Sequence, residues 1–507
     1  MARKKKKERV FGPVSVMFVI LAVVAVLSCL FSIFEIEAYK TVIANNTLES
    51  TLVTVKNILS IEGFQFIIGN IVDNFRQFEP LVLIIISLLG IGICERSGLI
   101  QAVIAPFKKI KFTVIIFLTM LLGIISTVIG DYSYIFLIPL TGVVYRYLEK
   151  NPILGILITF IGITIGYGTG IIFNYNDHLL GLMTQVSASL DVDKNYKYSL
   201  FSDIYIMIIS TGLISYIGTI IIDKFLVPKF TKKYIYEEEE LIIDSSAKRK
   251  SFVVGILMLL LVIYFILPIK LPFAGILLDG SKTRYMDKLF SSDSPFGNGL
   301  VFIISSIFMI CGYVYGKLSK NIKKSHDFSL GLSKNFENLG FLFVLMFFIS
   351  QVIAIIDWSN LGVVIGAKLI ELMGNMQFSG LPLIITFIIV VILVSILIPN
   401  TITKWELMSP TIIPLFMQSN ITPGFTQFIF KVADGIGKCI SPIFMYYIIT
   451  LAFLEKYRVS EKKQISLFGT YRMILPSILM IGLVWVLIIS LWYLIGFPIG
   501  IGIYSTL

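Results

Sequence analysis

The fold is decided by the stretch Gly162-Ile163-Thr164-Ile165-Gly166-Tyr167-Gly168-Thr169-Gly170, which places four glycines inside an apolar, helix-forming segment. The polar run Asn174-Tyr175-Asn176-Asp177-His178 lies a few residues further on. Glycine lowers the cost of unwinding a helix. A helix that is broken at membrane depth is tolerated only inside protein or around a polar cavity. The stretch therefore predicts a discontinuous membrane helix over 153–190 that borders a polar cavity.

A second segment of the same character lies in the other half of the chain. It reads Lys431-Val432-Ala433-Asp434-Gly435-Ile436-Gly437-Lys438 and leads to Ser441-Pro442, which predicts a second break within 424–456. Half-helix ends carry partial charges that suit anionic solutes and cations. Polar tips of two hydrophobic hairpins match the two breaks. The first tip holds Ser126, Thr127, Gly130, Asp131 and Ser133, and the second reads Pro399-Asn400-Thr401-Ile402-Thr403-Lys404-Trp405-Glu406.

Composition places the whole chain in a membrane. Of 507 residues, 56% are hydrophobic and 14% are charged, and the mean hydropathy is +0.90. A soluble protein has about 25% charged residues. The apolar run at 14–34, preceded by basic residues at 3–9, is too long for a signal peptide and is interpreted as a retained first helix. The net charge of +11 fits basic cytoplasmic loops better than nucleic-acid binding. Four cysteines without a CxxC pair indicate neither a disulfide framework nor a zinc site.

We predict an all-α polytopic membrane protein with nine crossings and two re-entrant hairpins, at 112–148 and 381–417. The crossings are 13–36, 79–104, 153–190, 203–226, 251–268, 298–316, 339–357, 424–456 and 471–496. The segments that this map places in the cytoplasm hold 29 Lys and Arg residues, against 10 in the external segments 37–78, 191–202, 269–297 and 358–380. This bias predicts a cytoplasmic N-terminus and an external C-terminus.

The same order of parts occurs twice along the chain, which we treat as one integral membrane domain over 1–507. In 79–226 and again in 339–496, a helix is followed by a hairpin, a broken segment and a second helix. Counting along the predicted spans from the helix at 79–104 to the helix at 339–357 gives five steps, and an odd number predicts an inverted repeat of the kind that many secondary transporters have. The helices at 13–36 and 251–316 lie outside the repeat as a scaffold, and the acidic run at 237–240 belongs to a cytoplasmic linker.

Ionisable residues at membrane depth cost about 2.5–3.5 kcal/mol each, so each needs a reason. Asp177 is the first candidate for binding substrate or a coupling ion. Asp131 and Asp434 either take part in ion coupling or cap half-helices. Lys431 and Lys438 either bind a substrate carboxylate or pair with Asp434, and for Lys431 the spacing i, i+3 favours pairing.

Four further side chains allow two interpretations each. Lys404 and Glu406 flank the second tip, where a structural place at the membrane interface is favoured. Trp405 could stack on an aromatic substrate or anchor the interface. His178 could relay protons, although a histidine with no partner in the sequence usually does not.

Several runs are distinctive enough to resemble a known family. They include Asn57-Ile58-Leu59-Ser60-Ile61-Glu62-Gly63, Glu95-Arg96-Ser97-Gly98-Leu99, Gly130-Asp131, Trp358-Ser359-Asn360-Leu361-Gly362, Lys404-Trp405 and Pro442. From about residue 50 to residue 500 the chain resembles the p-aminobenzoyl-glutamate transporter (AbgT) family. The resemblance implies a homodimeric inner-membrane transporter with nine helices and two re-entrant hairpins. It also implies p-aminobenzoyl-glutamate as substrate, export of sulfonamide antimetabolites in some members, and coupling to protons or sodium.

The resemblance carries over a site at Asp177, Trp405, Pro442 and the tip 400–403, and the chain departs from the family pattern in the same places. The tip reads Asn400-Thr401-Ile402-Thr403 where the family has small Ser-Ala-Ser-Ala. Lys431 replaces an arginine, which removes bidentate carboxylate recognition. Lys438 replaces an asparagine, and Tyr175-Asn176-Asp177-His178 replaces Thr-Leu-Asp-Pro. These departures bear on the substrate and not on the fold.

The sequence thus predicts an ion-gradient-coupled secondary transporter of p-aminobenzoyl-glutamate-like aromatic carboxylates, with export of sulfonamide-type antimetabolites as a further activity. No cofactor or metal is expected, apart from Na⁺ or H⁺ as the coupling ion. The expected partners are an anionic solute, lipid and a second copy of the chain, and nucleic acid is not expected to bind. The substrate-binding candidates are Asp177, Asn174, Asn400, Thr401, Thr403, Trp405, Lys431, Lys438 and Pro442, and the ion-coupling candidates are Asp177, Asp434 and Asp131.

Other functions explain the sequence less well. A dicarboxylate or peptide carrier of the same superfamily is the alternative transporter. An intramembrane enzyme is disfavoured because there is no metal-ligand cluster and no serine with an adjacent base. A scaffolding protein would not need paired polar breaks, and without a GxxxxGK[ST] loop transport driven by ATP is not expected.

Overall fold

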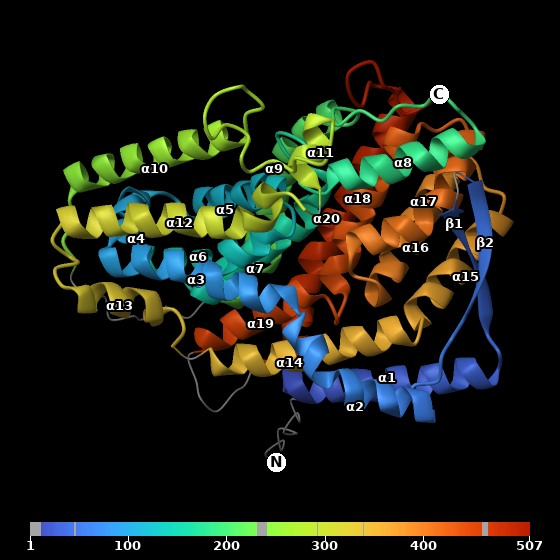
Figure 1. Ribbon diagram of the computed structural model, residues 1–507, viewed down its shortest axis with the longest axis horizontal. Coiled ribbons are helices and arrows are strands. Elements are labelled where there is room, and N and C mark those ends of the chain that lie inside the picture. Colours follow the sequence, from blue (N-terminus) through green and yellow to red (C-terminus); the bar gives the residue numbers. More distant parts are fainter. Residues whose placement is uncertain (1–11, 45–46, 231–240, 292, 338, 459–464) are drawn as a thin grey trace, which may run out of the picture.

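The computed structural model describes residues 12–44, 47–230, 241–291, 293–337, 339–458 and 465–507. The basic N-terminal run at 3–9 and the acidic linker at 237–240 lie outside these residues. Nearly all secondary structure in the described residues is helical (Figure 1). One antiparallel hairpin, β1 (Glu37–Ala44) with β2 (Thr47–Thr54), pairs Glu37 with Thr54 at one end and Ala44 with Thr47 at the other.

Nine helices in the described residues are long and apolar enough to cross a membrane, which confirms the all-α polytopic fold. Five of them correspond closely to predicted crossings, and a sixth, α10, begins a few residues early. They are α1 (Pro13–Ile33), α9 (Ile204–Phe225), α10 (Ser245–Ile266), α12 (Pro295–Leu318), α14 (Gly340–Trp358) and α20 (Leu467–Ile495). Short helices surround them: α4 (Leu99–Ile104), α11 (Tyr285–Phe290), α13 (Ser325–Lys334), and the 3-10 turns Ala105–Lys109 and Val227–Lys229.

Two segments predicted to be external loops are helical. Within 37–78, α2 (Ile61–Arg76) runs almost directly into α3 (Glu79–Ser97), so that Ile61–Ser97 forms one candidate span. Within 358–380, α15 (Leu361–Asn375) forms a further helix. The exposed large apolar side chains of α2 are Ile61, Phe64, Ile68 and Val72. Their spacing makes a narrow apolar stripe, which a window of average hydropathy does not detect.

Both predicted hairpins are pairs of helices. The first consists of α5 (Phe112–Ser126) and α6 (Tyr132–Tyr147), joined by a 3-10 turn at Thr127–Ile129 and by Gly130. The second consists of α16 (Gly380–Leu397) and α17 (Thr401–Gln418). The first arms, α5 and α16, are among the nine helices long enough to span, so the re-entrant path of the hairpins stays a prediction.

The first broken segment lies where the glycine run predicts it. Helix α7 (Pro152–Ile165) ends in a 3-10 turn at Gly166–Gly168, and α8 (Asp177–Asp191) begins after an irregular stretch. Tyr175 in that stretch donates its backbone N–H to the Val128 carbonyl at 3.0 Å, so the break is held against the first hairpin tip.

The second break lies within the predicted segment 424–456, after the glycine-containing run and not inside it. Helix α18 (Pro423–Ile440) continues through the glycine-containing run, and the chain bends by 43° between α18 and α19 (Met445–Lys456). Pro442 lies in this bend, and proline restricts the residue before it and cannot continue the hydrogen-bond ladder. Gly435 serves close packing instead, because a Cβ there would lie 2.3 Å from the Thr164 carbonyl oxygen.

The two halves place equivalent parts together at the centre of the molecule. Helix α5 packs against α7, and α16 packs against α18, so each hairpin lies along its own broken helix. Helix α18 also contacts α7 and α8, which joins the halves (Figure 1). This order of parts agrees with two repeats, and their inverted relationship stays a prediction.

Candidate functional site

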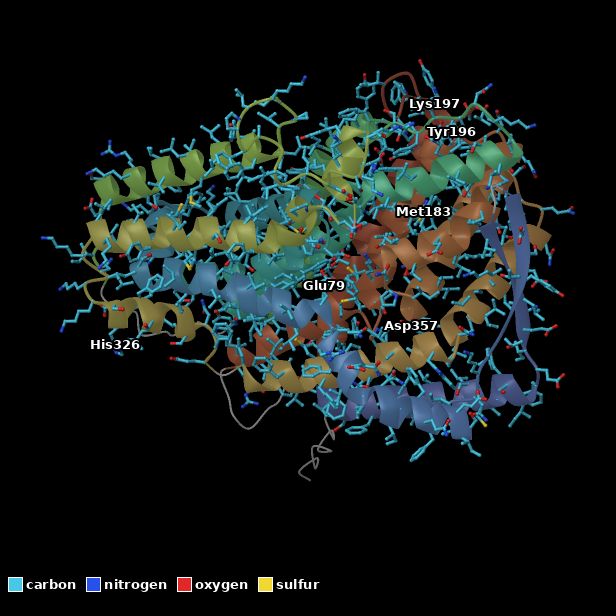
Figure 2. The ribbon with its side chains drawn as sticks, in the orientation of Figure 1. Glu79, Met183, Tyr196, Lys197, His326 and Asp357 are labelled. Carbon is cyan, nitrogen blue, oxygen red and sulfur yellow. The ribbon has the colours of Figure 1, made fainter. Side chains whose placement is uncertain are left out.

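A polar cavity of about 360 Å³ lies where the two hairpin tips, the two breaks and the start of α3 meet. Glu79, one of its wall residues, lies near the middle of the molecule (Figure 2). The wall is formed by Gln77, Phe78, Glu79, Pro80, Asp131, Tyr132, Tyr175, Asn176, Ile353, Asn400, Thr401, Ile402, Met445 and Tyr446. Two carboxylates and three tyrosines therefore face the cavity, and none of the described residues that line it is basic.

Next to the cavity lies a polar group that we call the hairpin cluster: Asp131 and Thr401, which also line the cavity, and the fully buried Lys404, Asp434 and Lys438. The Asp131 side chain is 28% exposed. Lys404 and Asp434 form a direct ion pair, and Thr401 donates its hydroxyl to Asp434 Oδ2 at 2.6 Å. Lys438 Nζ lies 3.3 Å from Asp434 Oδ2 and 3.7 Å from Asp131 Oδ1. The cluster joins both hairpin tips to α18, and its two ammonium groups balance its two carboxylates.

A second group, the Lys431 cluster, consists of Lys431, Asp177 and Asp203. Lys431 Nζ lies 3.0 Å from Asp177 Oδ1 and 3.1 Å from Asp203 Oδ2, and all three residues are buried. Asp177 Oδ2 also accepts the backbone N–H of Asn174 at 2.7 Å, which fixes the end of the first break. Within ion-pair distance in the described residues, one ammonium therefore faces two carboxylates.

The predicted pairing of Lys431 with Asp434 is wrong. Lys431 contacts α8 and the start of α9 instead, whereas Lys438 is the lysine that pairs with Asp434. The Cα–Cβ bonds of a helix lean toward its N-terminus. Lys438 therefore leans back toward Asp434, and Lys431 leans away from it.

The predicted place of Lys404 at the membrane interface is also wrong, because this side chain is 0% exposed and is paired with Asp434. Glu406 on the same helix is exposed. Trp405 is fully buried too, so it is no interface anchor. Its ring lies 4.4 Å from that of Phe430, and it does not line the cavity.

A chain of hydrogen bonds leads from Trp405 toward the Lys431 cluster. Trp405 Nε1 donates to Thr184 Oγ1 at 3.0 Å, and Thr184 donates to Gln427 Oε1 at 2.6 Å. Gln427 Nε2 then donates to the Tyr198 hydroxyl at 2.9 Å. The tryptophan therefore aligns the second hairpin with α8 and α18, a role in positioning these helices.

The other predicted residues are divided between the cavity and its supports. Asn400 lines the cavity and caps α17 by accepting a hydrogen bond from the backbone N–H of Thr403 at 3.0 Å. Thr403 is exposed and does not line the cavity. Asn174 is buried beside Asp177. His178 does have a partner: its Nε2 lies 2.7 Å from Asp287 Oδ1 on α11.

Among the site residues that sequence reasoning missed are Glu79, which lines the cavity, and Asp203 in the Lys431 cluster. Asp203 lies at the junction of the external segment 191–202 and the apolar segment that follows it, where a carboxylate attracts no notice. The structure buries it beside Lys431. An aspartate at the first residue of a predicted crossing, in a chain with surplus buried lysines, is the signal that would have found it.

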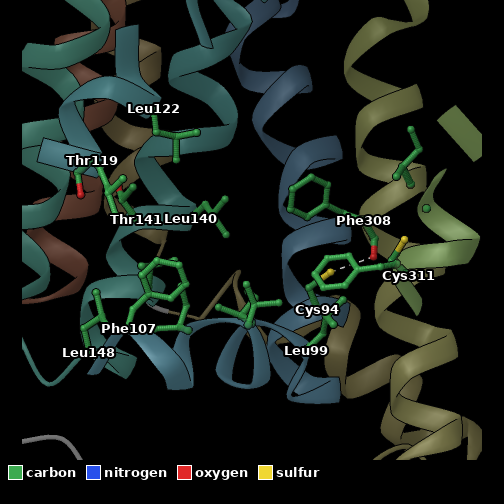
Figure 3. A pocket seen from close by; sticks show the side chains of 18 of the residues that line it. Cys94, Leu99, Phe107, Thr119, Leu122, Leu140, Thr141, Leu148, Phe308 and Cys311 are labelled. Atoms are coloured by element: carbon green, nitrogen blue, oxygen red, sulfur yellow. Dashed lines mark hydrogen bonds between the residues drawn. The ribbon is translucent and has the colours of Figure 1, made fainter. Parts of the chain in front are cut away.

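A larger cavity of about 670 Å³ lies elsewhere, between α4, the first hairpin, α10 and α12 (Figure 3). Its walls are apolar, with side chains such as Phe107, Leu122 and Leu148, and it contains none of the predicted site residues. Cys94 Sγ within it lies 2.9 Å from the Phe308 carbonyl oxygen. Such walls offer nothing to a charged solute.

Comparisons with known proteins agree with this architecture. The chain matches the model of the AbgT putative transporter family over residues 5–507. It is 26% identical over 467 residues to the p-aminobenzoyl-glutamate transport protein of Escherichia coli, covering 92% of this chain and 89% of that protein. The solved structure of the Alcanivorax borkumensis YdaH transporter is similar with a TM-score of 0.50 and 23% identity, covering 97% of this chain and 100% of the other. Neisseria gonorrhoeae MtrF, of a class of antimetabolite efflux pumps, is similar with a TM-score of 0.50 and 24% identity, covering 98% of each chain.

Proposed function

We propose, because this chain belongs to the AbgT putative transporter family, that it is a secondary transporter of p-aminobenzoyl-glutamate-like aromatic carboxylates. The curated relative is a p-aminobenzoyl-glutamate transport protein, which supports this class of substrate. The chain is a membrane transporter and not an enzyme, and the bacterial inner membrane suits it.

The observation that carries the proposal is the cavity between the two hairpin tips. Both tips, both broken segments and α3 contribute to its wall, so movement of either hairpin would change access to it. The rings of Tyr132 and Tyr175 lie 5.8 Å apart in this wall, and Tyr446 completes it. At this distance, within the range of about 4.5–7 Å over which aromatic pairs attract, the two rings contact each other and form one aromatic surface against which the ring of a substrate can pack.

For the coupling ion we propose a proton held by the Lys431 cluster. A buried charge without a counter-charge is strongly unfavourable. Both carboxylates contact the same ammonium, at 3.0 Å for Asp177 and 3.1 Å for Asp203. The ammonium balances one of them, and the other therefore binds a proton or a cation. The hydroxyl of Tyr198 interacts electrostatically with the carboxylates of both aspartates. Release of this proton would leave a net negative cluster, which would disfavour rearrangement of the empty transporter.

Sulfonamide-type antimetabolites are a second candidate substrate class, favoured by the charge of the cavity wall. Glu79 and Asp131 both line it, and none of the described wall residues is basic. A neutral arylamine meets less electrostatic repulsion there than p-aminobenzoyl-glutamate, which itself carries two carboxylates, so the charge of the wall favours this second class whereas the aromatic rings suit both. The similar structure of an antimetabolite efflux pump makes such compounds the natural competitors to try. Simple dicarboxylates are the least favoured substrates of this cavity.

The test is flux in proteoliposomes under an imposed proton or sodium gradient, with labelled p-aminobenzoyl-glutamate and a labelled sulfonamide. We expect flux with a proton gradient that disappears in Asp177→Asn. Glu371→Gln is the matched control, since Glu371 is 55% exposed and pairs only with Lys368 on the same helix. Unimpaired flux in Asp177→Asn would refute the assigned site, and a wild-type protein that moves neither compound would refute the assigned substrates.

We also propose a homodimer, an inverted repeat, a cytoplasmic N-terminus and an external C-terminus. The apolar stripe of α2 and the nearly unburied α10 could each face a second copy or lipid. Crosslinking in the membrane tests the dimer, and accessibility of single cysteines to an impermeant reagent tests the orientation.

A further inference from the structure

The ammonium of Lys438 is surrounded by oxygen atoms in the way that a bound metal ion would be. Its Nζ lies 3.3 Å from Asp434 Oδ2 and 3.7 Å from Asp131 Oδ1, and it donates to the Thr401 hydroxyl. The ring centroid of Tyr167 lies 4.3 Å away, which adds a cation–π contact. The lysine is 0% exposed. An ammonium thus occupies a pocket of oxygen atoms that is closed on another side by an aromatic face.

The oxygens around Lys438 come from three separate elements. Asp131 belongs to the first hairpin tip, Thr401 begins the second arm of the second hairpin, and Asp434 lies on α18. Asp131 Oδ1 is buried and accepts no hydrogen bond from the described residues, so the ammonium is the group that compensates it. Without a cation at this point, the carboxylates of Asp131 and Asp434 would lose the positive charge that lies between the first hairpin tip and α18.

Charge balance separates this place from the Lys431 cluster. In the hairpin cluster, Lys404 and Lys438 balance Asp131 and Asp434. A free metal ion added here would leave a net positive charge in a buried site, which is unfavourable. The hairpin cluster is therefore already saturated with cations.

We propose that the ammonium of Lys438 is a tethered cation that takes the place of a free sodium ion between the two hairpin tips. This proposal rests on the proposed transport function and adds to it how the closure of the hairpin tips depends on ions. A tethered cation cannot dissociate, so the closure of the tips does not depend on external sodium, and the coupling ion has to bind elsewhere in the protein. Lys438 is accordingly the residue that makes this transporter independent of sodium at its hairpins.

Replacing the lysine should uncover the ion site. In Lys438→Asn the carboxylates of Asp131 and Asp434, the Thr401 hydroxyl and a new amide oxygen would surround the vacated volume. Carboxylate and carbonyl oxygens are the ligands that hard metal cations prefer. Lys438→Met fills the same volume with an apolar chain and supplies no oxygen, so it should bind sodium less well.

The experiment uses the full chain purified in detergent, with radioactive sodium binding and thermal unfolding in sodium chloride or choline chloride at one ionic strength. We expect Lys438→Asn to bind sodium saturably above the wild-type level and to unfold at a higher temperature in sodium than in choline. The wild-type protein should unfold at the same temperature in both salts. Lys456→Asn is the control: this half-buried lysine at the far end of α19 donates to the Asn335 carbonyl at 3.1 Å, away from the hairpin tips.

Three results would overturn the proposal. One is a folded Lys438→Asn that binds no more sodium than the wild type. Another is a Lys438→Asn that unfolds equally in both salts, whatever its stability. The third is sodium binding by the wild type that Asp131→Asn abolishes, because sodium would then share the site with the lysine. None of these measurements needs a substrate, so failure of the proposed substrates would leave the sodium result standing, and the reverse also holds.

Discussion

Lys431→Met is expected to destabilise the protein strongly. It removes the ammonium that lies 3.0 Å from Asp177 and 3.1 Å from Asp203, where all three side chains are at most 3% exposed. Removal of one partner of a buried ion pair costs about 3–5 kcal/mol, because a charge is left without compensation. Methionine retains most of the lysine volume, so little of this loss comes from packing.

A double-mutant cycle separates the charge effect from other causes. Asp203→Asn alone leaves a balanced Lys431–Asp177 pair, so we expect it to destabilise the protein by less than Lys431→Met does. With Asp203→Asn in the background, Lys431→Met leaves only Asp177 uncompensated. The coupling free energy between Lys431 and Asp203 should lie in the upper part of the range of about 0.5–3 kcal/mol that contacting residues show.

The assay is denaturant unfolding in detergent, followed by intrinsic tryptophan fluorescence and repeated at two pH values. Lowering the pH should rescue Lys431→Met, since protonation removes the uncompensated charge of the carboxylates. A Lys431→Met protein as stable as the wild type, or additive effects in the cycle, would refute the assignment of Asp203 to this cluster.

Three other substitutions follow from single contacts. Trp405→Ala should destabilise the protein by about 3–5 kcal/mol in the same unfolding assay, and Trp405→Phe by clearly less, because the ring contact with Phe430 survives. Gly435→Ala should cost about 1–3 kcal/mol and lower flux, since its Cβ would lie 2.3 Å from a backbone oxygen of α7; equal stability would contradict that packing. In the loop after α10, hydroxyls of Ser291 and Ser281 lower the pKa of Asp279 to about 2. The ionised carboxylate therefore stabilises this loop fully above pH ~4, and the stabilisation is lost as the pH falls toward the pKa of about 2. Hydrogen exchange of 267–294 should show this acid sensitivity, and Asp279→Asn should remove it.

The sequence was informative wherever one residue type dictates local structure. The glycine run at 162–170 located the first break, and the polar tips located both hairpin turns. It failed for α2, whose apolar residues form a stripe with a low average hydropathy. At the second break, glycine was read as a helix breaker, whereas in α18 it allows close helix packing and Pro442 ends the helix.

For the site, the sequence identified several of the buried charges, although not Asp203 or Lys404, and it did not identify how they pair. Spacing along one helix gave Lys431 and Asp434 as partners, although side-chain lean and the neighbouring helices decide the pairing. The partners Asp177, Asp203 and Asp131 all come from other elements, at separations of more than two hundred residues. Local pattern carries no information on contacts at that distance.

The charges on α18 are better explained by transport than by stability. Lys431, Asp434 and Lys438 lie on one face of the helix, within about 10 Å along its axis. Buried ion pairs add little net stability, and an apolar face would pack as well. One end of this face is in a balanced cluster and the other is in a cluster with a surplus carboxylate. Binding of a proton by the Lys431 cluster therefore makes the whole face neutral. An uncompensated charge at membrane depth costs about 2.5–3.5 kcal/mol, which is roughly a hundredfold in population. Rearrangement of α18 against the hairpins would thus be favoured only in the protonated state, and such a restriction is what prevents movement of the empty transporter from dissipating the gradient.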